Sequence, residues 1–225
     1  MLVIGLDTST MVGGVSLVGP DGLVGEYVLN VRSTHSERLL PAVERVLEDA
    51  GVSLDTVDGI AVVTGPGSFT GLRIGAATAK GFAYALKKPV VGVSVLEALA
   101  WQFQWFSGLV CSLIDARRQT VYAQVFRRLQ PVTGAVNCSV AAVVATCCSQ
   151  SEPVLFAGDG ALVYEQQLND AWMVLPSREQ RVLHTASVAG LGRKLLLEGR
   201  QTDAMTLVPT YMRKSEAELK WEQKT

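Results

Sequence analysis

The segment Thr64–Gly75 reads TGPGSFTGLRIG, and it joins the apolar run Gly59–Val63 to a long apolar stretch that ends near Leu86. The first run has the length of a buried strand, and the second has the length of a helix. A glycine-rich turn between a strand and a helix directs free backbone N–H groups to one place, where the helix dipole also favours an anion. The segment therefore predicts an α/β protein with a candidate phosphate or nucleotide loop.

Neither of the two common nucleotide motifs is present in its strict form. A Walker loop ends in Gly-Lys-Ser/Thr, but no lysine follows Gly71. The dinucleotide fingerprint also fails, because its third glycine falls at position 71, one residue late. Two interpretations stay open. One is an anion site with Gly67, Ser68 and Thr70 as its residues, and the other is a tight turn in which Ser68 or Thr70 caps the helix.

The helix expected from Leu72 to about Leu86 is apolar on nearly all sides, which predicts that it is covered on more than one face. Ala76, Ala79 and Ala83 recur at i, i+3 and i+7, so their small side chains would let another helix approach closely. We predict that this stripe contacts a partner, and the alternative is that it packs on the chain's own sheet.

Composition sets limits on the class of protein. The chain has 225 residues, with 48% hydrophobic residues, 18% charged residues and a net charge of −1. This length allows one large or two small domains, and the low charge favours a surface partly covered by a partner. No global charge attracts the chain to nucleic acid. Four cysteines without C-x-x-C spacing, no basic leader and no apolar run of ~18 residues predict a cytoplasmic protein with reduced thiols and no membrane span.

The hydrophobic pattern predicts an antiparallel meander that leads into parallel crossover units. We expect strands at 2–6, 12–18, 23–29, 59–64 and 89–95, and helices at 36–50 and 72–86. After an aromatic patch at 101–106 the opening pattern returns, which we interpret as a weak internal duplication. The second half is expected to contain strands at 109–115, 120–127, 140–144 and 154–157 and a helix at 187–197.

Asp7 and Asp115 each end the first strand of one half and precede a hairpin. This arrangement is similar to the RNase H-like fold of the actin-like ATPase superfamily, in which such carboxylates manage a metal-bound nucleotide. It predicts two RNase H-like domains, residues 1–105 and a smaller one at 106–225. Asp7, Thr8 and Ser9 are therefore candidates for nucleotide or anion binding, although the turn lacks the glycine of the related kinases. The alternative role of Asp7 is to bind local N–H groups.

Four segments, taken in order, resemble the TsaB (YeaZ) family, which supports bacterial synthesis of threonylcarbamoyladenosine in tRNA. They are Ile4–Thr10 (IGLDTST), His35–Pro41 (HSERLLP), Gly65–Gly75 (GPGSFTGLRIG) and Pro209–Arg213 (PTYMR). The likeness is dense over residues 1–100 and sparse afterwards. It implies a non-catalytic paralogue of the transferase subunit TsaD.

The resemblance also implies how the chain works with its partners. It implies pairing with TsaD through the helices at 36–50 and 72–86, with the interface residues His35, Leu39, Leu72, Gly75, Ala76, Ala79 and Ala83. The complex would accept the ATPase TsaE and contact tRNA, whereas the chain alone is expected to homodimerise and not to bind a membrane. No intrinsic cofactor is expected, and ATP or ADP at the partner interface is left open.

TsaD has a Val-Gly-Val-x-His-x-x-x-His junction, whose two histidines share one helix face and can bind a metal ion. Here the junction reads VGVSVLEAL, so Val95 and Leu99 occupy the ligand positions. We therefore predict no metal site and no catalytic residue. The chain has only two histidines, His35 and His184, and they are far apart in the sequence. An ATP-dependent small-molecule kinase remains the alternative, and a peptidase is less favoured because no nucleophile–base motif is present.

Overall fold

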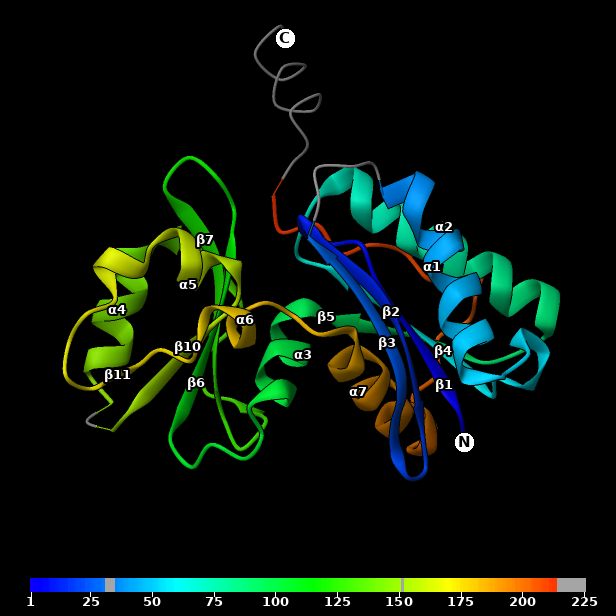
Figure 1. Cartoon of the computed structure of the whole chain (residues 1–225). Coiled ribbons are helices and arrows are strands. Elements are labelled where there is room, and N and C mark those ends of the chain that lie inside the picture. Colours follow the sequence, from blue (N-terminus) through cyan, green and yellow to red (C-terminus); the bar gives the residue numbers. More distant parts are fainter. Residues whose placement is uncertain (31–34, 151, 214–225) are drawn as a thin grey trace, which may run out of the picture.

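The computed structural model describes residues 1–30, 35–150 and 152–213 (Figure 1). Its first sheet has the order β3-β2-β1-β4-β5. The strands are β1 Val3–Asp7, β2 Val12–Gly19, β3 Gly22–Asn30, β4 Gly59–Gly65 and β5 Val90–Ser94. β1, β2 and β3 pair antiparallel, whereas β4 pairs parallel with both β1 and β5. The predicted meander and crossover units are confirmed.

The second sheet has the order β11-β10-β6-β7-β8, and β9 pairs with β7. Its strands are β6 Leu109–Asp115, β7 Thr120–Arg127, β8 Gln130–Pro131, β9 Val136–Ser139, β10 Val154–Ala157 and β11 Met173–Val174. β6 has an antiparallel neighbour in β7 and a parallel neighbour in β10, as β1 has in β2 and β4. This shared connectivity supports the internal duplication.

One expected strand is wrong: residues 140–144 belong to the helix α4, Val140–Cys148. The run of valines and alanines has no clear strand period, and Ser139 Oγ accepts a hydrogen bond from the N–H of Ala142 at 3.3 Å. This bond caps the helix. Val140, Val143 and Cys147 then fall on one buried face, which follows a helical period.

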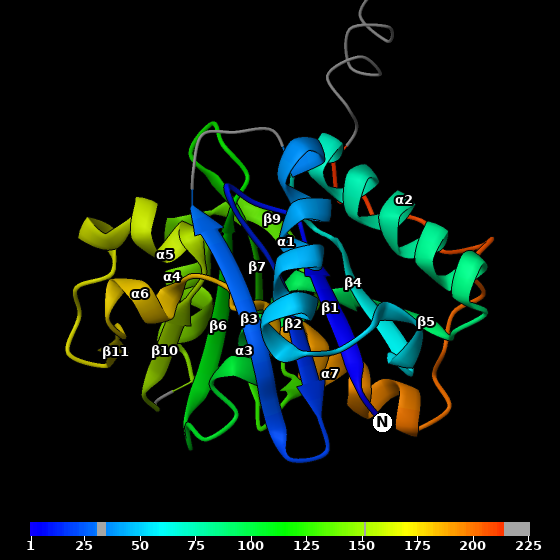
Figure 2. The ribbon, with the colours of Figure 1, turned by 45° about the vertical axis from the view of Figure 1, so that its right-hand side comes forward.

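Helices cover both faces of the first sheet (Figure 2). Besides α4, the helices of the described chain are α1 His35–Ala50, α2 Phe69–Leu86, α3 Val95–Gln102, α5 Asp159–Val163, α6 Arg178–Arg181 and α7 Thr185–Leu197. Of these, α1, α2 and α7 pack on the first sheet. Short 3-10 turns lie at Leu54–Thr56 and Glu165–Gln167. Ile4 and Leu6 pack in one core with α1 and α2, whereas Val3 packs with α7 on the other face. No helix in the described part of the chain is long and apolar enough to cross a membrane.

The expected division into residues 1–105 and 106–225 needs a correction. α7 comes from the second half of the chain but packs on β1, β2 and β4 of the first sheet. A Cβ built on Gly5 would lie 2.8 Å from Cβ of Ala189 in α7, so the glycine allows this close packing. Further along, the N–H of Thr210 donates to the carbonyl of Thr64 at 2.7 Å. Residues 185–211 therefore complete the first half.

The stripe of small residues on α2 lies in the core, contrary to the predicted partner contact. The buried residues of α2 are Gly71, Leu72, Gly75, Ala76, Ala79 and Ala83. Leu39 of α1 is buried in the same first half. These side chains pack within the chain, so the prediction that they form the partner surface is wrong. The side chain of His35 lies outside the described residues.

The burial of Ala79 gives a direct test. Ala79 is 0% exposed, whereas Ala77, two residues earlier on α2, is exposed. Ala79→Glu buries a carboxylate without a cation, and we expect it to lower the free energy of unfolding by at least about 3 kcal/mol. Ala77→Glu is the control, with an expected change within about 0.5 kcal/mol. Urea denaturation measures both, and equal stabilities of the two variants would contradict the packing.

Candidate functional site

The candidate site is built where the turn after β1 meets the glycine-rich loop before α2. Oδ1 of Asp7 accepts a hydrogen bond from the N–H of Ser9 at 2.8 Å. The hydroxyl of Thr8 donates to the carbonyl of Gly71 at 2.7 Å, and the N–H of Ser68 donates to the carbonyl of Ser9 at 2.7 Å. Asp7, Thr8 and Ser9 are buried. The turn and the loop are thus one hydrogen-bonded unit.

The glycines of the loop are explained by this contact. A Cβ built on Gly71 would lie 1.8 Å from the carbonyl oxygen of Thr8, and one on Gly67 would lie 2.4 Å from that of Ser9. Real Cβ atoms do not approach backbone atoms so closely, so only glycine fits at either position. Ser68 Oγ accepts from the N–H of Gly71 at 3.3 Å. The prediction that Ser68 caps the helix is therefore confirmed, and Thr70 is exposed on its first turn.

The second half repeats this arrangement. A Cβ built on Gly158 would lie 1.9 Å from the carbonyl oxygen of Leu113 in β6, just as Gly71 meets Thr8. Asp159 Oδ1 accepts from the N–H of Asp115 at 2.9 Å, and the hydroxyl of Tyr164 donates to Oδ1 of Asp115 at 3.3 Å. In both halves the end of the first strand thus contacts the glycine-containing segment that follows a neighbouring strand, through Thr8 and Ser9 in the first half and through Leu113 and Asp115 in the second.

Asp159 is a site residue that the sequence analysis did not single out. Its pKa rises to about 6 because of burial first and then because of the negative charges of Asp115 and Asp7, against the lowering effect of two backbone hydrogen bonds. The negative charge of Asp7 in the first half thus also acts on this carboxyl group of the second half. The signal in the sequence was the Gly-Asp-Gly that directly follows β10.

A second cluster fixes the C-terminal part of the described chain against the start of α2. The rings of Phe69 and Tyr211 stack with a centroid distance of 4.1 Å and an interplanar angle of 2°. Nε of Arg73 donates to the hydroxyl of Tyr211 at 3.0 Å, and its guanidinium carbon lies 5.5 Å from the centroid of the Phe69 ring. The structure thereby brings together two of the motifs that the resemblance rests on, although they are distant in the sequence.

Val95 and Leu99, which the resemblance places at the metal-ligand positions of TsaD, are apolar core residues. Val95 and Leu99 are both 0% exposed and lie in the core cluster shared by α3, α7 and β6. Within the described residues, no group of three histidine, cysteine, aspartate or glutamate side chains is arranged to hold a metal ion. The structure therefore offers no donor set for a resident metal ion in that part of the chain.

His184 has a partner that the sequence did not indicate. Its Nδ1 lies 3.2 Å from Oε2 of Glu26 in β3, and the hydrogen bond raises the pKa of His184. Burial acts to raise the pKa of Glu26, but hydrogen bonds from His184 and from the N–H of Ala186 hold it below its usual value. Since Glu26 binds the first turn of α7, the pair joins that helix to the edge strand β3.

Two similar α/β halves, each with an aspartate at the end of its first strand and a glycine-containing loop beside that strand end, are typical of the actin-like ATPase fold. The ethanolamine utilization protein EutJ from Carboxydothermus hydrogenoformans shares this fold, with a TM-score of 0.54 and 13% identity over 85% of this chain and 90% of that chain. YeaZ from Pseudomonas aeruginosa has a TM-score of 0.79 and 27% identity, and the match covers 94% of this chain and 99% of that chain.

Sequence comparison identifies the family. Residues 25–221 match the family TsaD, described as tRNA N6-adenosine threonylcarbamoyltransferase. The tRNA threonylcarbamoyladenosine biosynthesis protein TsaB of Bacillus subtilis (strain 168) is 33% identical over 228 residues, covering 98% of this chain and 98% of that protein. The chain belongs to the TsaB family of tRNA threonylcarbamoyladenosine biosynthesis proteins. Its family membership implies a role in that pathway.

The raised pKa of Asp159 predicts a dependence of stability on pH. Because its folded pKa of about 6 lies above the ordinary 3.8, its stabilising contribution is complete below about pH 4 and is lost as the pH rises through 6. We expect Asp159→Asn, which still accepts from Asp115, to be more stable than the parent at pH 8 by up to about 3 kcal/mol. Near pH 4 this advantage should disappear. Urea denaturation at both values measures it, with Asp21→Asn in an exposed turn as the control, and a parallel pH profile would contradict the assignment.

The contact between Gly71 and Thr8 predicts that two glycines of one helix respond oppositely to the same change. Gly71→Ala places a methyl group on the Thr8 carbonyl, so we expect a loss of at least about 2 kcal/mol in the free energy of unfolding. Gly81→Ala has nothing within 4 Å of its new Cβ and should gain about 0.5–1 kcal/mol through helix propensity. Thermal denaturation measures both, and a stable Gly71→Ala protein would refute the contact.

Proposed function

We propose that the chain is a non-catalytic subunit that binds TsaD and orders it for the formation of threonylcarbamoyladenosine in tRNA. The observation that carries this proposal is the outer face of α2. Ala77, Gly81 and Ala85 lie at i, i+4 and i+8, and all three are exposed. They form an exposed face of small residues, whereas Ala76, Ala79 and Ala83 are buried.

Gly81 has no packing reason within the described chain. A glycine inside a helix costs about 1 kcal/mol relative to alanine, and a Cβ built on Gly81 meets nothing within 4 Å. The glycine at Gly71, in contrast, is required by the Thr8 carbonyl. A helix from another protein that packs closely on α2 would explain why a small residue stands at Gly81, because the separation of two helices depends on the side chains at their contact.

Exposed large apolar side chains occur on α1, on α2 and in the segment that Lys80 binds. Tyr84 of α2 is 79% exposed, Met205 is 76% exposed and Leu40 of α1 is 49% exposed. Met205 is held beside α2 by a hydrogen bond from Nζ of Lys80 to its carbonyl at 3.2 Å. Exposed tyrosine and methionine side chains are typical of protein–protein interfaces, in which aromatic residues and methionine are enriched. The proposal therefore keeps α1 and α2 as the helices that bind the partner, but it assigns the contact to their exposed residues.

The role as a helper subunit follows from the residues at the site. Val95 and Leu99 are buried where the catalytic paralogue has its histidines, so the metal-dependent chemistry is assigned to TsaD. With a net charge of −1, the chain alone would neutralise few phosphates and so release few counterions from tRNA, and tRNA is therefore proposed to bind through the complex. The same proposal includes three further points. The complex recruits TsaE, ATP or ADP binds at the partner interface, and the chain homodimerises in the absence of TsaD.

The test is a bulky substitution on the exposed face. We expect Gly81→Leu to fold like the parent and to bind TsaD about tenfold to a hundredfold more weakly, since an inserted side chain in a packed contact costs about 1–3 kcal/mol. Ala145→Leu, on an exposed position of α4, is the control. Calorimetric titration measures affinity, and tRNA modification with TsaD should fall with it.

Two results would count against the proposal. Unchanged affinity of Gly81→Leu for TsaD would remove α2 from the interface. Turnover of Mg-ATP on a small-molecule acceptor by the isolated chain would favour the kinase alternative instead.

A further inference from the structure

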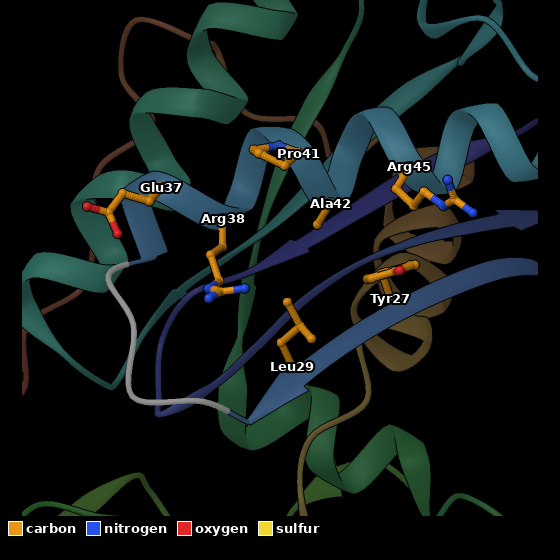
Figure 3. A pocket seen from close by; sticks show the side chains of 7 residues that line it. All are labelled: Tyr27, Leu29, Glu37, Arg38, Pro41, Ala42 and Arg45. Atoms are coloured by element: carbon orange, nitrogen blue, oxygen red, sulfur yellow. The ribbon is translucent and has the colours of Figure 1, made fainter.

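A groove between α1 and the edge strand β3 has no assigned role (Figure 3). It has a volume of about 400 Å³, and we call it the α1–β3 groove. Tyr27 and Leu29 of β3 form one wall, and Arg38, Pro41 and Ala42 of α1 line the other. β3 ends the sheet, and among the described residues it pairs with β2 alone. Its outer edge therefore presents unpaired backbone groups, which are a template for another strand.

The charges of the groove favour an aromatic occupant. Arg45 pairs with Asp49 at 3.0 Å and with Glu48 at 3.6 Å. Arg38 makes no ion pair with any described residue and points from α1 toward the strands, near Leu29 (Figure 3). A guanidinium above an apolar wall that contains a tyrosine is a favourable place for an aromatic ring, which gains cation–π and stacking contacts.

Residues 214–225 have a sequence that matches such a groove, although they lie outside the described residues. They read KSEAELKWEQKT. Ala217, Leu219 and Trp221 alternate with charged residues at positions 218, 220 and 222. This period of two is typical of a strand with one buried face. Leu219 and Trp221 would lie on that face.

The chain is also long enough to reach the groove. Tyr211 stacks on Phe69 at the start of α2, beside the turn that follows β1. The register aligns Asp7 of β1 with Gly14 and Gly14 with Val28, so the C-terminal end of β3 lies at the same end of the sheet. β1 and β3 are two strand spacings apart, about 10 Å. The residues from 213 to 219 can span roughly 20 Å.

We propose that residues 216–222 add to the free edge of β3 as an antiparallel strand and place Leu219 and Trp221 in the α1–β3 groove. The direction follows from the starting point, because the segment begins at the end of the sheet where β3 finishes. Trp221 would lie beside Arg38, with the charged residues on the opposite, solvated face. The added strand would protect an exposed edge that otherwise invites association.

Hydrogen exchange of the full chain tests the proposal. We expect the β3 amides in residues 23–30 to exchange at least about tenfold faster in Trp221→Asp than in the parent, because the outer edge loses its partner. Lys220→Gln, on the opposite face, is the matched control and should exchange like the parent. Arg38→Gln should raise the exchange of the same amides. The α7 amides, on the opposite face of the first sheet, report any global loss of stability.

Three outcomes would overturn the proposal. One is equal exchange of β3 in the parent and in Trp221→Asp. Another is protection of β3 that increases with protein concentration, because the occupant would then be a second copy of the chain. If Trp221→Asp destabilises the whole protein and also accelerates hydrogen exchange in α7, Leu219→Ser and Arg38→Gln are compared with the parent instead. The third outcome is then unchanged β3 exchange in both of these variants.

Discussion

The contact between the turn after β1 and the loop before α2 determines how the rest of the first half is arranged. Thr8 and Gly71 meet backbone to backbone, with a hydrogen bond of 2.7 Å from the Thr8 hydroxyl to the Gly71 carbonyl. A Cβ at Gly71 would lie 1.8 Å from the Thr8 carbonyl oxygen, so the contact exists only because the residue is glycine. It fixes the start of α2 on the end of β1. The buried face of α2 then follows from the helical period.

The same contact gives the glycines of the loop a structural role in place of the predicted phosphate binding. In a nucleotide-binding loop, glycines leave room for phosphate next to the backbone. Here Gly67 and Gly71 are adjacent to the backbone of Ser9 and Thr8 instead. The second half repeats the device with Gly158 and Leu113, and there it positions Asp159 against Asp115. A fold associated with nucleotides thus uses its glycines to hold strand ends together, which fits the proposed role as a structural partner of a catalytic paralogue.

Small residues lie on two faces of α2, one buried in the chain and one exposed. Ala79 and Ala83 are buried against the chain's own sheet, whereas Ala77 and Gly81 are exposed. Successive residues are about 100° apart around a helix axis, so these two pairs lie on different faces of α2. The first requires small residues because the sheet is close. The second has no intrachain requirement, so its small residues point to a contact made by association.

The sequence by itself determined the strands of the first half, its helices α1 and α2 and the duplicated strand-end aspartates, because these depend on local periodicity. It left the cap of α2 open between Ser68 and Thr70 and did not indicate α3. It did not determine that residues 140–144 are helical, since a short run of valines suits both structures until Ser139 caps it. Which face of α2 is buried depended on the contact between Gly71 and Thr8, and the return of α7 to the first sheet depended on the contact between Gly5 and Ala189. Only the tertiary structure could place Asp159 beside Asp115 and Tyr211 on Phe69, because no periodicity encodes the packing of segments so far apart in the chain.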